Sequence, residues 1–208
     1  MKQNILLLLC LLGCQLLSAQ INTTAVTANA LPNQLKYEGS LVQAVKWEAD
    51  GEQHYLLLSQ KTKYPSGKND MDGYPTHNAA LYAYHLVVVG DSSKLIWRIY
   101  DFIEDCGFDI IQQFIGKQIH LTDLDKNGEP EIWVIYRNQC TSDLSPATTK
   151  LIMYEGKTKY AFRGVDKVKS SPSGYTGGTY TMDKQWLSGN NAFLLYAKEY
   201  WTKHITRN

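Results

Sequence analysis

The sequence feature that most constrains the fold is a series of short segments in which apolar and polar residues alternate, as in Leu95–Tyr100. Successive side chains of a strand point to opposite faces, so this alternation predicts strands with one buried face. An aromatic content of 12%, with 14 tyrosines, also favours strands over helices. The predicted strands are Leu41–Glu48, His54–Gln60, Ala80–Val89, Leu95–Phe102, Gln118–Thr122, Glu131–Arg137, Lys150–Tyr154 and Lys159–Arg163.

The predicted strands fall into two sets of four, and the sets resemble each other. Each set ends in a hairpin of leucine and aromatic residues, which suggests a degenerate repeat of about 75 residues. The repeat is open to three interpretations: blades of a propeller, two sheets packed face to face, or a chance similarity of two meanders. Two blades cannot close a ring, which needs at least four. We therefore expect a mainly β fold, with two antiparallel four-stranded meanders packed as a sandwich-like or blade-like single domain.

The regions around the predicted strands have other patterns. Residues 20–34 are small and polar, which predicts an extended or loose segment before a single domain at 35–208. Apolar residues at helical spacing between Ala192 and Trp201 predict a C-terminal helix at about 191–205. Residues 170–178 are rich in Ser and Gly, which predicts a loop.

The first residues have the pattern of a signal peptide. A basic start precedes the apolar run Ile5–Leu12, and the small residue Ala19 fits a cleavage site, so we expect a leader at 1–19. Lipidation at Cys14 is the alternative. The apolar run is shorter than the roughly 20 residues that a spanning helix needs. No other apolar stretch of the sequence is long enough to cross a bilayer, so we expect no transmembrane span in the mature chain.

Charge and motifs exclude several classes of function. Lys and Arg total 21 and Asp and Glu total 20, a balance that argues against nucleic acid or an anionic membrane as the main partner. The common acyl-transfer, zinc and nucleotide motifs do not occur in the sequence. Glu104 with Asp105 or Asp109 could form a carboxylate pair for glycoside cleavage, although acidic loop residues are usually just solvated. Enzymatic activity therefore stays an open alternative.

Cys106 and Cys140 are the two cysteines that follow the predicted leader. An even pair in an exported chain favours a disulfide, and two free buried thiols are the alternative. A metal site is not expected at these cysteines, because no CxxC spacing or histidine cluster accompanies them.

The sharpest local motif is the acidic segment 123–131. Asp123, Asp125, Asn127 and Glu131 could turn their oxygens toward a hard cation, with Ca²⁺ as the candidate cofactor. The position of Glu131 resembles the short calcium loops of FG-GAP propeller blades. In the other interpretation, the segment is a turn whose carboxylates accept backbone N–H groups. We favour the turn, since the motif occurs once and lacks flanking EF-hand helices.

A wider resemblance covers residues 105–163. It rests on Asp105-Cys106-Gly107-Phe108-Asp109, Leu121–Gly128, Cys140-Thr141-Ser142-Asp143-Leu144-Ser145-Pro146, Lys150–Lys157 and Lys159–Gly164. With these elements the chain resembles the exported bacterial surface polysaccharide biosynthesis protein family. The resemblance implies a link to surface glycan and recurrence of both cysteines, which supports the disulfide, but it implies no catalytic residue.

These observations together predict an exported protein of a Gram-negative envelope, in the periplasm or at the cell surface. We expect a non-catalytic binding or accessory factor for surface polysaccharide, with surface glycan or envelope proteins as partners. The alternatives are a glycan-active enzyme that uses carboxylates and a calcium-stabilised interaction module.

Overall fold

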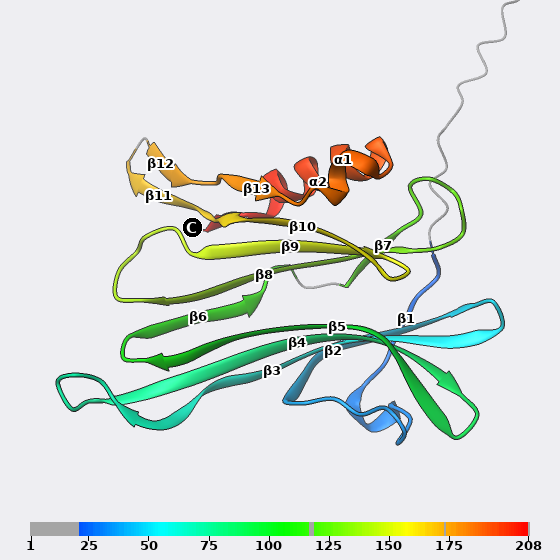
Figure 1. Ribbon diagram of the computed structural model, residues 1–208, viewed down its shortest axis with the longest axis horizontal. Coiled ribbons are helices and arrows are strands. Elements are labelled where there is room, and N and C mark those ends of the chain that lie inside the picture. Colours follow the sequence, from blue (N-terminus) through cyan, green and yellow to red (C-terminus); the bar gives the residue numbers. More distant parts are fainter. Residues whose placement is uncertain (1–20, 117–118, 173, 208) are drawn as a thin grey trace, which may run out of the picture.

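The computed structural model describes residues 21–116, 119–172 and 174–207, and it consists mainly of antiparallel strands stacked in layers (Figure 1). The predicted leader and Cys14 lie outside the described residues. The strands of the two large sheets are β1 (Thr24–Ala25), β2 (Ser40–Ala49), β3 (Glu52–Asn69), β4 (Pro75–Val89), β5 (Ser92–Cys106), β6 (Asp109–Phe114), β7 (His120–Thr122), β8 (Glu131–Thr141), β9 (Thr148–Glu155), β10 (Thr158–Val165) and β13 (Tyr180–Met182).

The first large sheet has the strand order β1-β2-β3-β4-β5, and its last four strands form the first predicted meander. The second large sheet has the order β13-β10-β9-β8-β6, and β7 also pairs with β8. The second predicted meander is therefore extended by β13 at one edge and by β6 at the other. All pairings within the two sheets are antiparallel.

The two sheets pack face to face and share one core, which confirms the sandwich-like arrangement. Alternate residues of each strand point into this core, as the sequence pattern predicts. Trp97 of β5 stacks on Tyr154 of β9, with ring centroids 4.2 Å apart. The core cluster contains Val45, Trp47, Leu56, Leu58, Leu81, Ala83, Trp97 and Ile99 from the first sheet and Ile132, Val134, Tyr136, Ile152, Tyr154 and Ala161 from the second.

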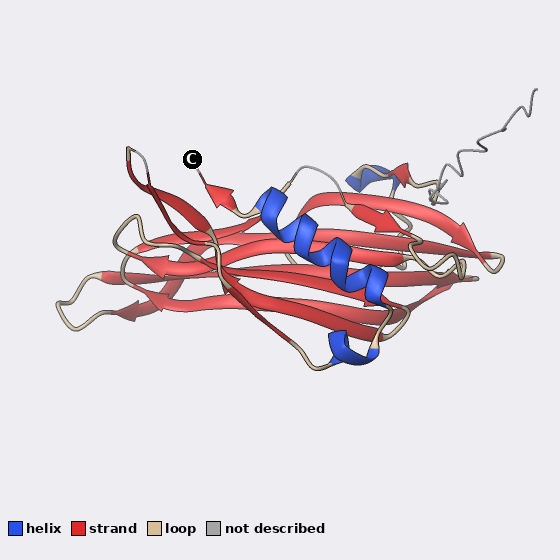
Figure 2. Cartoon of the chain, turned by 90° about the horizontal axis from the view of Figure 1, so that it is seen from above, coloured by secondary structure: helices blue, strands red, loops and turns tan. Residues whose placement is uncertain are grey.

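Helices cover the outer face of the second sheet (Figures 1 and 2). The short α1 (Gln185–Ser188) precedes α2 (Asn191–His204), which confirms the predicted C-terminal helix. The side chain of Asn190 caps α2 by accepting the N–H of Ala192 at 2.9 Å. Phe193, Ala197 and Trp201 of α2 are buried in a cluster that includes residues of the second sheet. No helix among the described residues has the length and apolar character to cross a membrane.

The structure corrects one prediction for the regions around the sheets and refines another. Part of residues 170–178 is a hairpin and not a loop, because β11 (Lys167–Ser171) pairs with β12 (Gly174–Gly177) and with β14 (Thr206–Arg207). The segment 20–34 is less loose than expected. Its described residues contain β1 and a 3₁₀ turn at Ala28–Ala30. Val26 and Leu31 pack on the outer face of the first sheet, and Ile21 packs against the core between the sheets.

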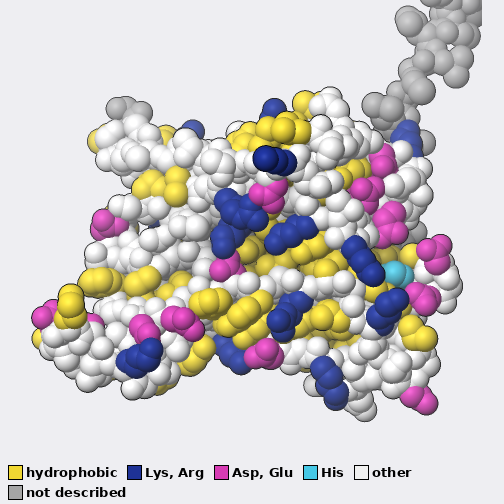
Figure 3. Space-filling model, viewed as in Figure 1, with side chains coloured by type: hydrophobic (Ala, Val, Ile, Leu, Met, Phe, Trp, Pro, Cys, Tyr) yellow, Lys and Arg dark blue, Asp and Glu magenta, His cyan; other side chains and the backbone are white. Residues whose placement is uncertain are grey.

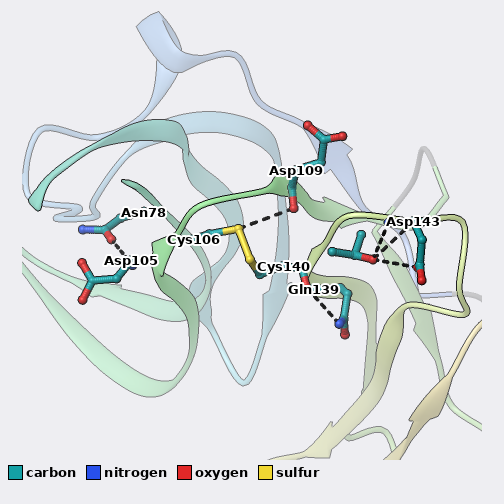
Figure 4. The surroundings of a disulfide bond; sticks show 8 residues. Asn78, Asp105, Cys106, Asp109, Gln139, Cys140 and Asp143 are labelled. Carbon is teal, nitrogen blue, oxygen red and sulfur yellow. Dashed lines mark hydrogen bonds between the residues drawn. A yellow bond between two sulfur atoms is a disulfide. The ribbon is translucent and has the colours of Figure 1, made fainter. Parts of the chain in front are cut away.

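A disulfide joins the two sheets. Cys106 at the end of β5 is bonded to Cys140 of β8, with their Cα atoms 5.8 Å apart (Figure 4). The predicted pairing is therefore confirmed.

Candidate functional site

The acidic turn between β7 and β8 brings three carboxylates together. Oxygens of Asp123, Asp125 and Glu131 lie within 4.8 Å of one another. Glu131 is fully buried at the start of β8, and Asp123 is buried beside it. The structure therefore assembles three of the four residues that the sequence suggests as metal ligands.

Asn127, the fourth of these residues, uses its side chain within the turn. Its Oδ1 accepts the N–H of Glu129 at 2.7 Å, and its Nδ2 donates to Asp125 at 3.1 Å and to Glu155 at 2.9 Å. Its oxygen is thus already engaged.

The carboxylates of the turn also accept backbone donors. Glu131 accepts the N–H of Leu124 at 3.0 Å, and Asp123 accepts that of Gly128 at 3.4 Å. Gly128 has a φ of 85°, a conformation that glycine adopts without strain. These contacts are those that the turn interpretation predicts. Burial, with Asp125 and Asp123 close by, raises the pKa of Glu131.

The carboxylates considered for glycoside cleavage do not converge. The side chains of Asp105 and Asp109 point in different directions on the two sides of the disulfide (Figure 4). Asp105 forms an ion pair with Lys68 at 2.8 Å, and this hydrogen bond lowers the pKa of Asp105. A general acid needs a raised pKa, so Asp105 is poorly suited to that role.

The histidines of the predicted strands make contacts within the protein. Nδ1 of His54 and Nε2 of His85 share a hydrogen bond of 2.9 Å. His120 hydrogen-bonds to Tyr196 of α2 and stacks against Tyr200. These contacts fit structural roles better than catalytic ones.

A row of stacked aromatic rings lies on the outer face of the first sheet. Tyr82 of β4 is directly opposite Tyr100 of β5, and each has an aromatic neighbour two residues along its own strand. Residues two apart share a face, so the four rings lie side by side. Centroid distances are 5.9 Å from Tyr84 to Tyr82, 5.1 Å from Tyr82 to Tyr100, and 5.1 Å from Tyr100 to Phe102. We call these four residues the aromatic ladder.

The two ends of the aromatic ladder differ in exposure. Tyr82 and Tyr84 are buried, and their hydroxyl groups hydrogen-bond to Glu38. Tyr100 and Phe102 are 48% and 43% exposed. The ladder therefore presents two aromatic rings to solvent at positions fixed by a regular strand.

A cavity of mixed polar and apolar lining adjoins the buried end of the aromatic ladder. It has a volume of about 440 Å³, within the range of small-molecule sites, roughly 300–1,000 Å³. Its walls combine Tyr84 and Leu86 of β4 with charged side chains. The remaining lining residues are Lys36, Tyr37, Glu38, Ser93, Leu95 and Arg98.

A second cavity opens at the free edge of β5, where the two sheets meet. It has a volume of about 280 Å³, and four basic residues line it: Arg98, Lys150, Lys159 and Arg163. We call this cavity the basic groove. Figure 3 shows lysine and arginine side chains gathered over the middle of this side of the molecule, between the sheets and among hydrophobic atoms.

Sequence reasoning missed the aromatic ladder and the basic groove. Aromatic residues two apart in adjacent predicted strands, Tyr82 with Tyr84 and Tyr100 with Phe102, are a signal that could have indicated the ladder. The groove has no such signal, since its four basic residues come from three strands of two sheets. Comparison of the chain with family models, curated proteins and solved structures finds no match.

Proposed function

We propose that the protein is a non-catalytic, exported factor of a Gram-negative envelope that binds a strand of surface polysaccharide along β5. The observation that carries the proposal is the exposed end of the aromatic ladder, Tyr100 and Phe102. Aromatic rings present a rigid apolar surface against which the C–H groups of a sugar ring can pack. Hydrogen-bonding groups beside the rings would hold the sugar hydroxyls.

The surroundings of Tyr100 and Phe102 suit an extended ligand better than a compact one. The 440 Å³ cavity and the basic groove both include residues of β5, and Arg98 lines both. A polymer that follows β5 would meet aromatic, polar and basic groups in turn. The residues of these two cavities belong largely to regular strands, so the surface is built on a rigid scaffold.

The enzyme alternative has weaker support. Asp105 is ion-paired at the exposed end of β5, and the two cavities along β5 are lined by other residues than Glu104, Asp105 and Asp109. We therefore propose binding without turnover.

Affinity electrophoresis tests the proposal. Native gels would contain a polysaccharide fraction released from Gram-negative cells and freed of nucleic acid. We expect the mature chain to be retarded. Loss of an aromatic contact costs about 0.5–1.5 kcal/mol, so Tyr100→Ala should weaken binding about two- to twelvefold.

Tyr175 provides a matched control. It is 50% exposed and lies under Lys167, much as Tyr100 lies under Arg98, but it belongs to β12. Tyr175→Ala should therefore bind like the wild type. Equal retardation of the Tyr100→Ala variant and the wild type, or no retardation of either, would contradict the proposal.

Calcium binding at the acidic turn stays a prediction. In its favour are three oxygens within 4.8 Å and, among the described residues, no ion pair to Asp123, Asp125 or Glu131. Against it are the hydrogen bonds that already satisfy the turn. A calcium titration, described below, separates the two interpretations.

A further inference from the structure

The basic groove holds more positive than negative charge. Two of its four cations have partners: Lys150 forms an ion pair with Asp101, and Arg163 forms one with Asp183. Asp101 also accepts hydrogen bonds from Tyr136 and Asn138, each at 3.1 Å, so this acid is fully engaged.

The other two cations, Arg98 and Lys159, form no ion pair among the described residues. Lys159 has Arg163 and Lys150 for neighbours, and partial desolvation together with these positive charges lowers its pKa. Arg98 lies over the ring of Tyr100, 5.7 Å from the centroid, and it shares the 440 Å³ cavity with Glu38. The pKa of Glu38 is lowered by its hydrogen bond to Lys61 and also by the charge of Arg98. The groove thus gathers two cations that form no ion pair among the described residues.

Arg98 connects the groove to the aromatic ladder. It lines both the groove and the 440 Å³ cavity, and it lies over the exposed ring of Tyr100. A ligand on Tyr100 would therefore lie beside two cations, and an anionic substituent on that ligand could reach them.

We infer that the polysaccharide carries negative charge, as carboxylate or phosphate, and that Arg98 and Lys159 bind these groups in the basic groove. The inference rests on the proposed function and specifies its ligand class. An acidic glycan fits both parts of the surface, because its sugar rings suit the exposed rings and its anionic groups suit the groove. A nucleic acid fits less well, since Lys and Arg total 21 in the sequence against 20 acids.

The experiment compares three forms of the envelope polysaccharide fraction: intact, carboxyl-reduced and phosphatase-treated. We expect the intact form to bind the wild type most tightly and one treatment to weaken binding, which identifies the anionic group. An exposed charge pair contributes little, so Arg98→Gln and Lys159→Gln should each weaken binding of the intact form by about two- to fivefold. Neither substitution breaks an ion pair, and near-native melting temperatures would confirm that both variants fold.

The control variant is Lys169→Gln, which removes an exposed lysine from β11 and should leave binding unchanged. The inference is overturned, and the proposed function stands, if all three forms bind equally and only Tyr100→Ala weakens them. Both fail if the protein retains no form of the polysaccharide. Polyglutamate is an anion without sugar rings. The inference and the proposed function also both fail if polyglutamate binds as tightly as the intact fraction and Tyr100→Ala does not change the binding.

Discussion

The pair of histidines in the core predicts how acid will affect stability. His85 is 3% exposed on β4, and burial together with the neighbouring His54 lowers its pKa from 6.5 to about 3. Its Nδ1 has no hydrogen-bond partner among the described residues. In the imidazolium this nitrogen would be a buried donor without an acceptor, which adds to the cost of protonation.

The sign of the effect follows from proton linkage. Since the folded pKa of His85 lies below the unfolded value, the unfolded chain takes up the proton first as the pH falls. The contribution of His85 to stability is complete above pH 6.5 and is lost between 6.5 and about 3. Between pH 7 and 4.5 the loss amounts to about 2.5 kcal/mol. For a chain of this size, that corresponds to a fall in melting temperature of roughly 5–10 °C.

Chemical denaturation at several pH values between 7 and 4.5 would measure this loss. His85→Gln provides the comparison, because glutamine can hydrogen-bond to His54 but does not titrate. The substitution will lower stability at pH 7, so the informative quantity is the difference between the two pH slopes. We expect the wild type to lose about 2.5 kcal/mol more than the variant. Equal slopes would refute the reasoning.

Three further predictions concern stability. The double variant Cys106→Ser/Cys140→Ser removes the disulfide, which closes a loop with a sequence separation of 34. Denaturant titration should show that the free energy of unfolding falls by about 3–4 kcal/mol. Asp166→Asn removes a fully buried charge that pairs with Arg137 at 2.7 Å, and the same assay should show a loss of about 3–5 kcal/mol; a loss under 1 kcal/mol would contradict this. If the acidic turn binds calcium with a Kd of about 10⁻⁴–10⁻³ M, a tenfold excess over Kd should raise the melting temperature by about 3–6 °C. Asp125→Asn should abolish that rise. If calcium does not change the melting temperature of the wild type, the calcium interpretation is wrong and the segment is only a turn.

The alternation of apolar and polar residues is sufficient to predict most strands of the two meanders. This alternation is a local signal, and in β5 it extends over enough residues to identify a strand. It fails for β6 (Asp109–Phe114), which contains two glutamines and is held by its pairing with the far end of β8. It fails also for the β11–β12 hairpin, where Ser and Gly suggest a loop but pairing with the C-terminal β14 imposes a strand.

The candidate sites show the same division between local and tertiary information. The sequence places Asp123, Asp125 and Glu131 near one another because a short turn connects them. The orientation of Asn127 depends on Glu155, which belongs to the next hairpin, so the motif alone could not predict it. The basic groove depends on how the edge of β5 lies against β9 and β10, which no local pattern specifies.

The central claim is that polysaccharide binds at the exposed end of the aromatic ladder. NMR spectra of the aromatic ring resonances, recorded while the envelope polysaccharide fraction is added, test it most directly. We predict saturable shifts of the Tyr100 and Phe102 rings, with the ring of Tyr175 unchanged. Shifts confined to other rings, such as Tyr196 and Tyr200 of α2, or no shifts at all, would contradict the claim.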